Sequence, residues 1–180
     1  MNIQVIAAAA YAGGMAGAVT PAAAEPTWLA PDELETWRAL HLVMTGLPGV
    51  LGGQLQRDSD LSFIEYYVLA VLSEQPQLTM RLSHLALLAN SELSRLSHLM
   101  RRLERRDLVR REPDPTDGRF TNAILTPAGH AKVVEAAPGH VAQVRRHVFD
   151  VLDDDEQAVL RSALRKVADR LLPSCEETTS

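Results

Sequence analysis

The residues of this sequence that could do chemistry are concentrated in a basic segment near its middle. Nine arginines and six acidic residues lie between Arg81 and Arg119, so this segment carries a charge of +3 while the whole chain carries −5. A basic segment within an acidic chain is the asymmetry expected of a face that meets a polyanion. A solvated arginine-rich helix has the same composition, so charge alone leaves both interpretations open.

The spacing of small and basic side chains over residues 91–105 favours duplex DNA as that polyanion. The residues expected to reach base edges in the major groove are Ser91, Ser94, Arg95, His98 and Arg101. Serine hydroxyls allow a close approach, and an arginine can fork onto a guanine in a contact that discriminates by about 1–3 kcal/mol. Three further arginines are better placed for phosphates, which fix register without carrying sequence information: Arg102, Arg105 and Arg110.

A turn-rich segment predicts a second contact to DNA. Residues 113–119 are dense in proline, aspartate and glycine, which favour tight turns. Gly118 permits such a turn and presents Arg119, a side chain that the negative potential of a narrow minor groove attracts. Asp117 can hold Arg119 or Arg110 in position by a charge-assisted pair.

A helix-turn-helix followed by a hairpin would position all of these residues. Apolar side chains recur at helical spacing on one face of residues 92–106: Leu93, Leu96, Leu99, Met100 and Leu103. A shorter helix is expected over 82–89, with Asn90 or Ser91 capping the second helix. Strand-like runs at 108–112 and 120–126 enclose the turn. This combination predicts a winged helix-turn-helix and favours the DNA interface over a solvated face.

Capping signals predict the helices on either side of this unit. Three N-terminal caps mark helix starts: Ser62 with Glu65, Thr126, and Asp153 with Glu156. The helix after Ser62 should be followed by an extended piece over 78–80. The long helix after Thr126 should bend at Pro138, because proline removes a backbone hydrogen bond.

The first and last helices carry more apolar surface than one core needs. A helix should begin at Pro31, and apolar side chains occur on more than one of its faces. Its stretch 46–53 contains one proline and four glycines, so a kink or break is expected there. Surplus apolar faces at both ends of the chain indicate a partner subunit.

Composition and motifs exclude several classes. Aromatic residues make up 4% of the chain, which argues against reading single strands by base stacking. One cysteine, Cys175, excludes an internal disulfide and a multi-cysteine zinc site. The six histidines show no metal-ligand spacing, and the sequence has no catalytic motif. We therefore expect no cofactor, no metal and no enzyme activity.

Trp37, His41 and Met44 are candidates for an effector pocket on the first helix. Their three-and-four spacing places them on one face. The core of a dimer is the favoured alternative for the same residues.

Four segments resemble the MarR-type (multiple antibiotic resistance) family of regulators. They are LSFIEYYVL at 61–69, LERRDLVRR at 103–111, DPTDGR at 114–119 and LTPAG at 125–129. The resemblance covers about residues 31–172. Leu93 departs from it, since many members have a small or polar residue at that position.

The resemblance implies a homodimeric transcriptional regulator that binds a pseudo-palindromic operator on double-stranded DNA, usually as a repressor. It also implies relief by a small phenolic or lipophilic effector, a cytoplasmic location and no membrane partner. The alternative, from another class, is a winged-helix module that binds a small molecule or a protein without DNA.

We therefore expect a mainly α chain with a small β wing, and five segments along it. They are an Ala/Gly-rich extension over 1–30 without the charged start of a signal peptide, a dimerisation helix over 31–57, the DNA-binding lobe over 58–126, further dimerisation helices over 127–172, and a tail over 173–180.

Overall fold

The structure is a computed structural model that describes residues 27–171. Most of the expected extension, residues 1–26, lies outside the described part, as do the tail 173–180 and Cys175. The chain divides into two compact units, residues 1–37 and residues 38–180. The features discussed below belong to the second unit unless stated otherwise.

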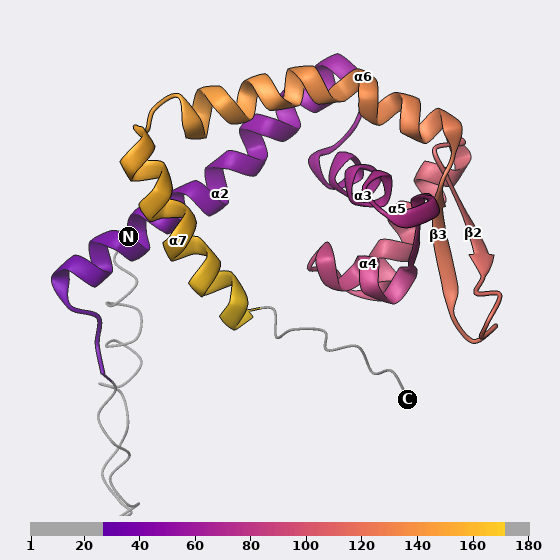
Figure 1. The fold of residues 1–180 in the computed structure, drawn as a ribbon, viewed down its shortest axis with the longest axis horizontal. Coiled ribbons are helices and arrows are strands. Elements are labelled where there is room, and N and C mark those ends of the chain that lie inside the picture. Colours follow the sequence, from indigo (N-terminus) through magenta and orange to yellow (C-terminus); the bar gives the residue numbers. More distant parts are fainter. Residues whose placement is uncertain (1–26, 172–180) are drawn as a thin grey trace, which may run out of the picture. The chain divides into compact units, whose positions relative to one another are not determined.

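The elements follow one another as the sequence predicts, with a small sheet among helices (Figure 1). In chain order they are α2 (Pro31–Ser59), α3 (Phe63–Ser73), a 3₁₀ turn (Pro76–Leu78), β1 (Thr79–Arg81), α4 (Leu82–Leu88), α5 (Leu93–Arg105), β2 (Val109–Pro113), β3 (Thr121–Leu125), α6 (Pro127–Val144), a π-helical turn (Arg145–Phe149) and α7 (Asp154–Leu171).

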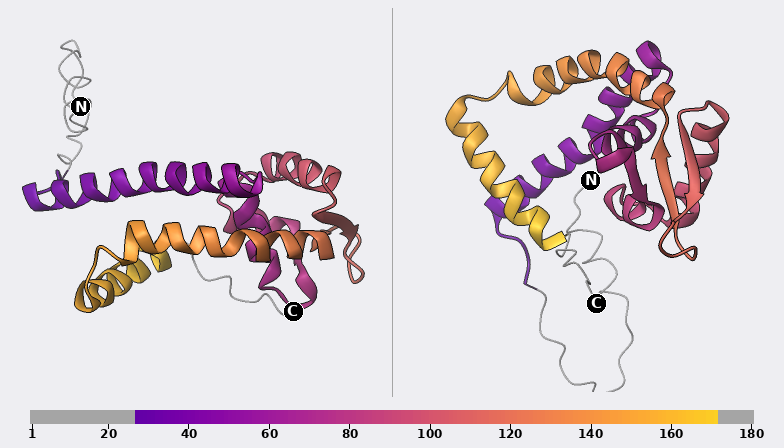
Figure 2. Two further views of the ribbon diagram at one scale, coloured as in Figure 1. Left: turned by 90° about the horizontal axis from the view of Figure 1, so that it is seen from above. Right: turned by 45° about the vertical axis from the view of Figure 1, so that its right-hand side comes forward.

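The sheet is an antiparallel hairpin with a third strand added to one edge. β2 and β3 pair with Arg111 opposite Ala123, and β1 pairs with the other side of β3, with Met80 opposite Ala123. Figure 2 shows the hairpin from two further sides. The predicted hairpin is confirmed. The extended piece expected at 78–80 begins one residue later and is a paired strand, a pairing that local sequence does not reveal.

The elements from α3 to β3, which we call the lobe, surround one core with α4 and α5 as its helix-turn-helix. The predicted apolar face of α5 is buried at Leu96, Leu99, Met100 and Leu103. Its partners include Leu69 and Leu72 of α3 and Leu85 of α4, which are fully buried. Leu93 is the exception and is 50% exposed, because it is the first residue of α5 and the buried face begins one turn later.

Three of the predicted caps are confirmed. Ser62 Oγ accepts from the Glu65 amide while a Glu65 carboxylate oxygen accepts from the Ser62 amide at 2.9 Å. Thr126 Oγ1 accepts from the Gly129 amide at 3.0 Å, and Asp153 and Glu156 bond reciprocally at 2.8 and 3.0 Å. Each cap satisfies amides that the helix start would leave unpaired.

The expected cap of α5 is wrong. The residue at the cap position is Glu92, without a side-chain hydrogen bond to the helix. Asn90 has a φ of 44°, a left-handed conformation that ends α4. The Ser91 hydroxyl donates to the Glu92 carbonyl at 3.3 Å instead. The turn is thus one residue longer than the capping signal indicates.

Of the kink or break expected at 46–53, the break is wrong, because α2 continues through Pro48 to Ser59, and the kink stays a prediction. Leu51 and Leu55 are buried after the proline, and this packing outweighs the weak helix propensity of the stretch. α6 is helical on both sides of Pro138, and the bend expected there stays a prediction. Its regular winding changes only at the π-helical turn of Arg145–Phe149.

The helices outside the lobe leave apolar side chains exposed in the single chain. None of the described residues of α7 is buried. Its exposed apolar residues are Val159, Leu160, Leu164, Val167 and Leu171. Val134 and Val141 of α6 and Leu42, Val43 and Val50 of α2 are exposed as well. Among the helices of residues 27–171, none combines the length and the hydropathy that crossing a membrane needs.

Candidate nucleic-acid interface

The outer face of α5 presents the predicted polar residues together. Ser94, Arg95, His98, Arg101 and Arg105 are all exposed, and Ser91 is half-buried at the turn before the helix. At 3.6 residues per turn Ser94, His98, Arg101 and Arg105 lie opposite the buried leucines, and Arg95 lies at the flank. The face is therefore held rigidly by the core while its polar groups stay in solvent.

Arg102, expected at a phosphate, is bonded to α3 and so is only partly available. Its Nε donates to Glu65 Oε1 at 3.3 Å, and its side chain is 50% exposed. Burial acts to raise the pKa of Glu65, but hydrogen bonds from Ser62 and Arg102 outweigh it and lower that pKa. Glu65 thus stays ionised, caps α3 and positions α5 at once.

Two further arginines anchor α5 at its far end, and sequence reasoning missed both. Arg106 Nη2 donates to the carbonyl of Asp60 at 2.8 Å. Arg111 on β2 forks onto Glu104 through two bonds of 2.9 and 2.7 Å. Those bonds lower the pKa of Glu104. The fork joins the recognition helix to the first strand of the wing, which we define as residues 109–125.

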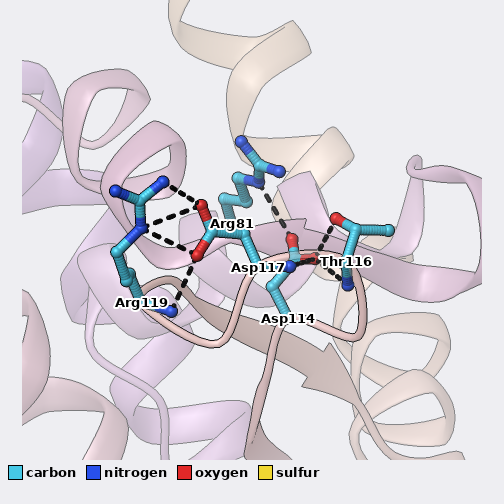
Figure 3. A network of polar contacts seen from close by, with 5 residues as sticks. All are labelled: Arg81, Asp114, Thr116, Asp117 and Arg119. Carbon is cyan, nitrogen blue, oxygen red and sulfur yellow. Dashed lines mark hydrogen bonds and ion pairs between the residues drawn. The ribbon is translucent and has the colours of Figure 1, made fainter.

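The turn between β2 and β3 is organised around the buried carboxylate of Asp114 (Figure 3). Asp114 accepts from the hydroxyl and amide of Thr116 at 2.6 and 2.9 Å, and from Arg81 Nε at 3.0 Å. These bonds hold the pKa of Asp114 far below its ordinary value. Arg81 also lies 4.6 Å from the ring centroid of Phe120. The residue before α4 thereby fixes the fold of the wing turn.

The tip of the wing carries the predicted pair. Arg119 donates through Nη2 and Nε to the Asp117 carboxylate at 2.6 and 2.9 Å, and its side chain is 85% exposed. These bonds lower the pKa of Asp117. Arg110 pairs with Glu112 at 3.2 Å rather than with Asp117. Of the two pairings left open by the sequence, the structure therefore has the one with Arg119.

Gly118 is not required by the turn that it occupies. Its φ lies outside the left-handed region, and a Cβ there would meet open space in the described part of the chain. Gly118 thus permits this turn, as expected, but other residues could occupy its position. The bonds to Asp114 and Asp117 shape this turn instead.

The predicted effector residues lie on α2, in two different units of the chain. Trp37 ends the first unit and is 38% exposed, while Met44 belongs to the second and is 48% exposed. His41 is exposed as well.

Comparison with solved structures shows what the chain is similar to. A MarR family transcriptional regulator from Streptomyces coelicolor, crystallised in complex with DNA, is 40% identical. The match has a TM-score of 0.78 and covers 85% of this chain and 96% of that one. The chain belongs to the MarR family.

Further comparisons agree with membership of the MarR family. AbsC, another family member from the same organism, is 38% identical with a TM-score of 0.76, and the match covers 81% of this chain and 98% of that one. BpsR from Bordetella bronchiseptica, whose DNA binding 6-hydroxynicotinic acid regulates, is 24% identical with a TM-score of 0.65, over 75% of this chain and 99% of that one, which shows the fold alone. A sequence profile of the MarR family matches residues 59–119. No curated protein matches the chain.

Proposed function

We propose that this MarR family member regulates transcription by binding duplex DNA as a homodimer, each copy placing α5 in the major groove of one half-site. The observation that carries the proposal is the exposed polar face of α5 with Arg119 exposed on the wing beside it. A major groove about 12 Å wide admits a helix, and the first turns of that helix reach the base edges.

The residues divide into three roles. We assign to the base edges the half-buried Ser91 and the exposed Ser94, Arg95, His98 and Arg101. Arg105 and Arg110 bind phosphates, and Arg102 does so with the part of its guanidinium that Glu65 leaves in solvent. Arg119 enters the minor groove at the side of the half-site, with Asp117 and Gly118 forming the turn that carries it.

Dimerisation is supported by the exposed apolar residues of α2, α6 and α7. Burial of apolar surface stabilises by about 25 cal/mol per Å². These helices therefore gain free energy when they pack against a second copy. A dimer with a twofold axis presents two identical α5 helices, which matches a pseudo-palindromic operator.

Repression, relief by a small phenolic or lipophilic effector, and action in the cytoplasm complete the proposal. Trp37, His41 and Met44 are the residues that we assign to effector contact. Titrating ligands of this class while following tryptophan fluorescence and DNA affinity tests the assignment. An effector should change both signals over one concentration range.

The proposal is tested by titrating labelled duplex with purified protein at several salt concentrations. Affinity should fall steeply with salt, because each neutralised phosphate releases counterions with a log–log slope of about −0.9 per contact. Arg119→Ala should weaken binding to all sequences, and Arg95→Ala should in addition lose about 1–3 kcal/mol of discrimination at one base position.

Arg145→Ala is the matched control, because Arg145 is exposed on the π-helical turn and pairs with Asp150 of the same turn region at 3.2 Å. It should leave both affinity and salt slope unchanged. Equal behaviour of the three variants would contradict the assignment of this face to DNA.

A further inference from the structure

Leu93 is an exposed apolar residue at the N-terminal end of α5, the end that we assign to the major groove. It is the first residue of α5 and 50% of it is exposed, next to the exposed Ser94 and Arg95. Leu93 is also the one apolar residue of α5 that the core leaves exposed, since Leu96, Leu99, Met100 and Leu103 are buried.

The position of Leu93 at the start of α5 directs its side chain toward the base edges of the DNA major groove. In a helix each Cα–Cβ bond tilts toward the N-terminus, so a side chain in the first turn projects beyond the helix end. The first turns of a recognition helix are the part that meets base edges. The apolar residues expected at the dimer interface lie on α2, α6 and α7. Dimerisation therefore does not explain why an apolar residue is exposed at position 93.

The major groove offers an apolar partner at thymine. Guanine, adenine and cytosine present donors and acceptors there, whereas thymine adds a C5-methyl group. A leucine exposed at the end of the helix that meets the base edges is therefore matched by that methyl. Its burial also removes apolar surface of Leu93 from water.

We propose that Leu93 is a specificity-determining residue that contacts a thymine C5-methyl in each half-site. The inference rests on the proposed function, since it requires α5 to lie in the major groove. It adds to that function a base preference that none of the polar residues supplies.

Replacing thymine by deoxyuridine, which lacks only that methyl, tests the contact. Duplexes carrying a half-site selected from a random pool would have each thymine replaced in turn, with affinity measured by fluorescence anisotropy at fixed salt. At one thymine position the wild-type protein should lose about fourfold in affinity per half-site, the worth of one buried methyl-sized group. Leu93→Ala should bind the thymine and deoxyuridine duplexes equally.

Leu87→Ala is the control, because Leu87 is equally exposed at 49% but lies on α4. It should keep the full penalty for deoxyuridine, and Leu93→Met should keep most of it. A wild-type protein indifferent to every thymine methyl, or a penalty that persists in Leu93→Ala, overturns the inference while DNA binding stands. Failure of the wild-type protein to bind any duplex overturns the proposed function and this inference with it.

Discussion

The helices α5 and α7 have similar sequence patterns and opposite environments. Both are amphipathic, but α5 buries four apolar residues in the lobe, whereas none of the described residues of α7 is buried. Apart from Leu93 at its start, α5 therefore presents its polar side to solvent, and α7 presents an apolar stripe as well. The comparison shows that an apolar stripe predicts burial but does not say in which molecule the partner lies.

The two regions should consequently respond to mutation in different ways. A change in the buried side of α5 alters the stability of each chain. A change in the apolar stripe of α7 alters the association of two chains and leaves the lobe intact.

The largest expected effect comes from the buried side of α5. Leu96→Ala should lower the free energy of unfolding by about 2–5 kcal/mol, because it removes a side chain that is 1% exposed and leaves a cavity. Denaturant titration followed by circular dichroism measures the change. A cost under about 0.5 kcal/mol would show that α5 is not held by this core.

The second-largest expected effect is on dimerisation, and it comes from the exposed apolar residues of α7. Leu164→Asp should shift the protein toward monomers in analytical ultracentrifugation and lower operator affinity more than tenfold, because a dimer holds two half-sites at once. Ser162→Asp adds the same charge at a position outside the stripe and should change neither. A stable dimer in Leu164→Asp would mean that the interface lies elsewhere.

The smallest expected effect is on the pH dependence of stability, and it comes from His140 of α6, which packs against the lobe. The ring of His140 is 4.5 Å from that of Tyr66 on α3, and burial lowers the pKa of His140. The folded state thus favours the neutral imidazole. Its contribution to stability is present above the ordinary pKa of 6.5 and is lost as the pH falls through the lower, folded value.

Unfolding titrations at a series of pH values measure this contribution. His140→Leu should flatten the loss of stability below pH 6.5, while substitution of the exposed His130 by glutamine should not. Identical pH dependence in wild type and His140→Leu would contradict the role of burial.

Local signals allowed most of the fold to be predicted. Caps such as Ser62 and Thr126 act within three residues, and the leucine spacing of α5 is a property of one helix. The continuation of α2 through Pro48 could not be predicted, because it depends on packing of Leu51 and Leu55 against other elements. Leu93 was expected on the buried face of α5 but is exposed. The spacing of apolar residues does not say where along a helix the core ends.

The polar groups of the site were predicted better than their supports. Arg119 and Asp117 are two residues apart, so their pair was one of the two that the sequence left open. The supports join residues far apart in sequence, as in the bonds of Arg81 to Asp114, Arg102 to Glu65 and Arg106 to Asp60. Only the folded lobe brings these residues together.

Selection of bound duplexes from a random pool is the most direct test of whether two copies of α5 read DNA together. A homodimer should recover two inverted copies of one short motif, with centres about 10 base pairs apart, one turn of the double helix. Recovery of no enriched sequence, or of a single unrepeated motif, would contradict recognition by a pair of α5 helices.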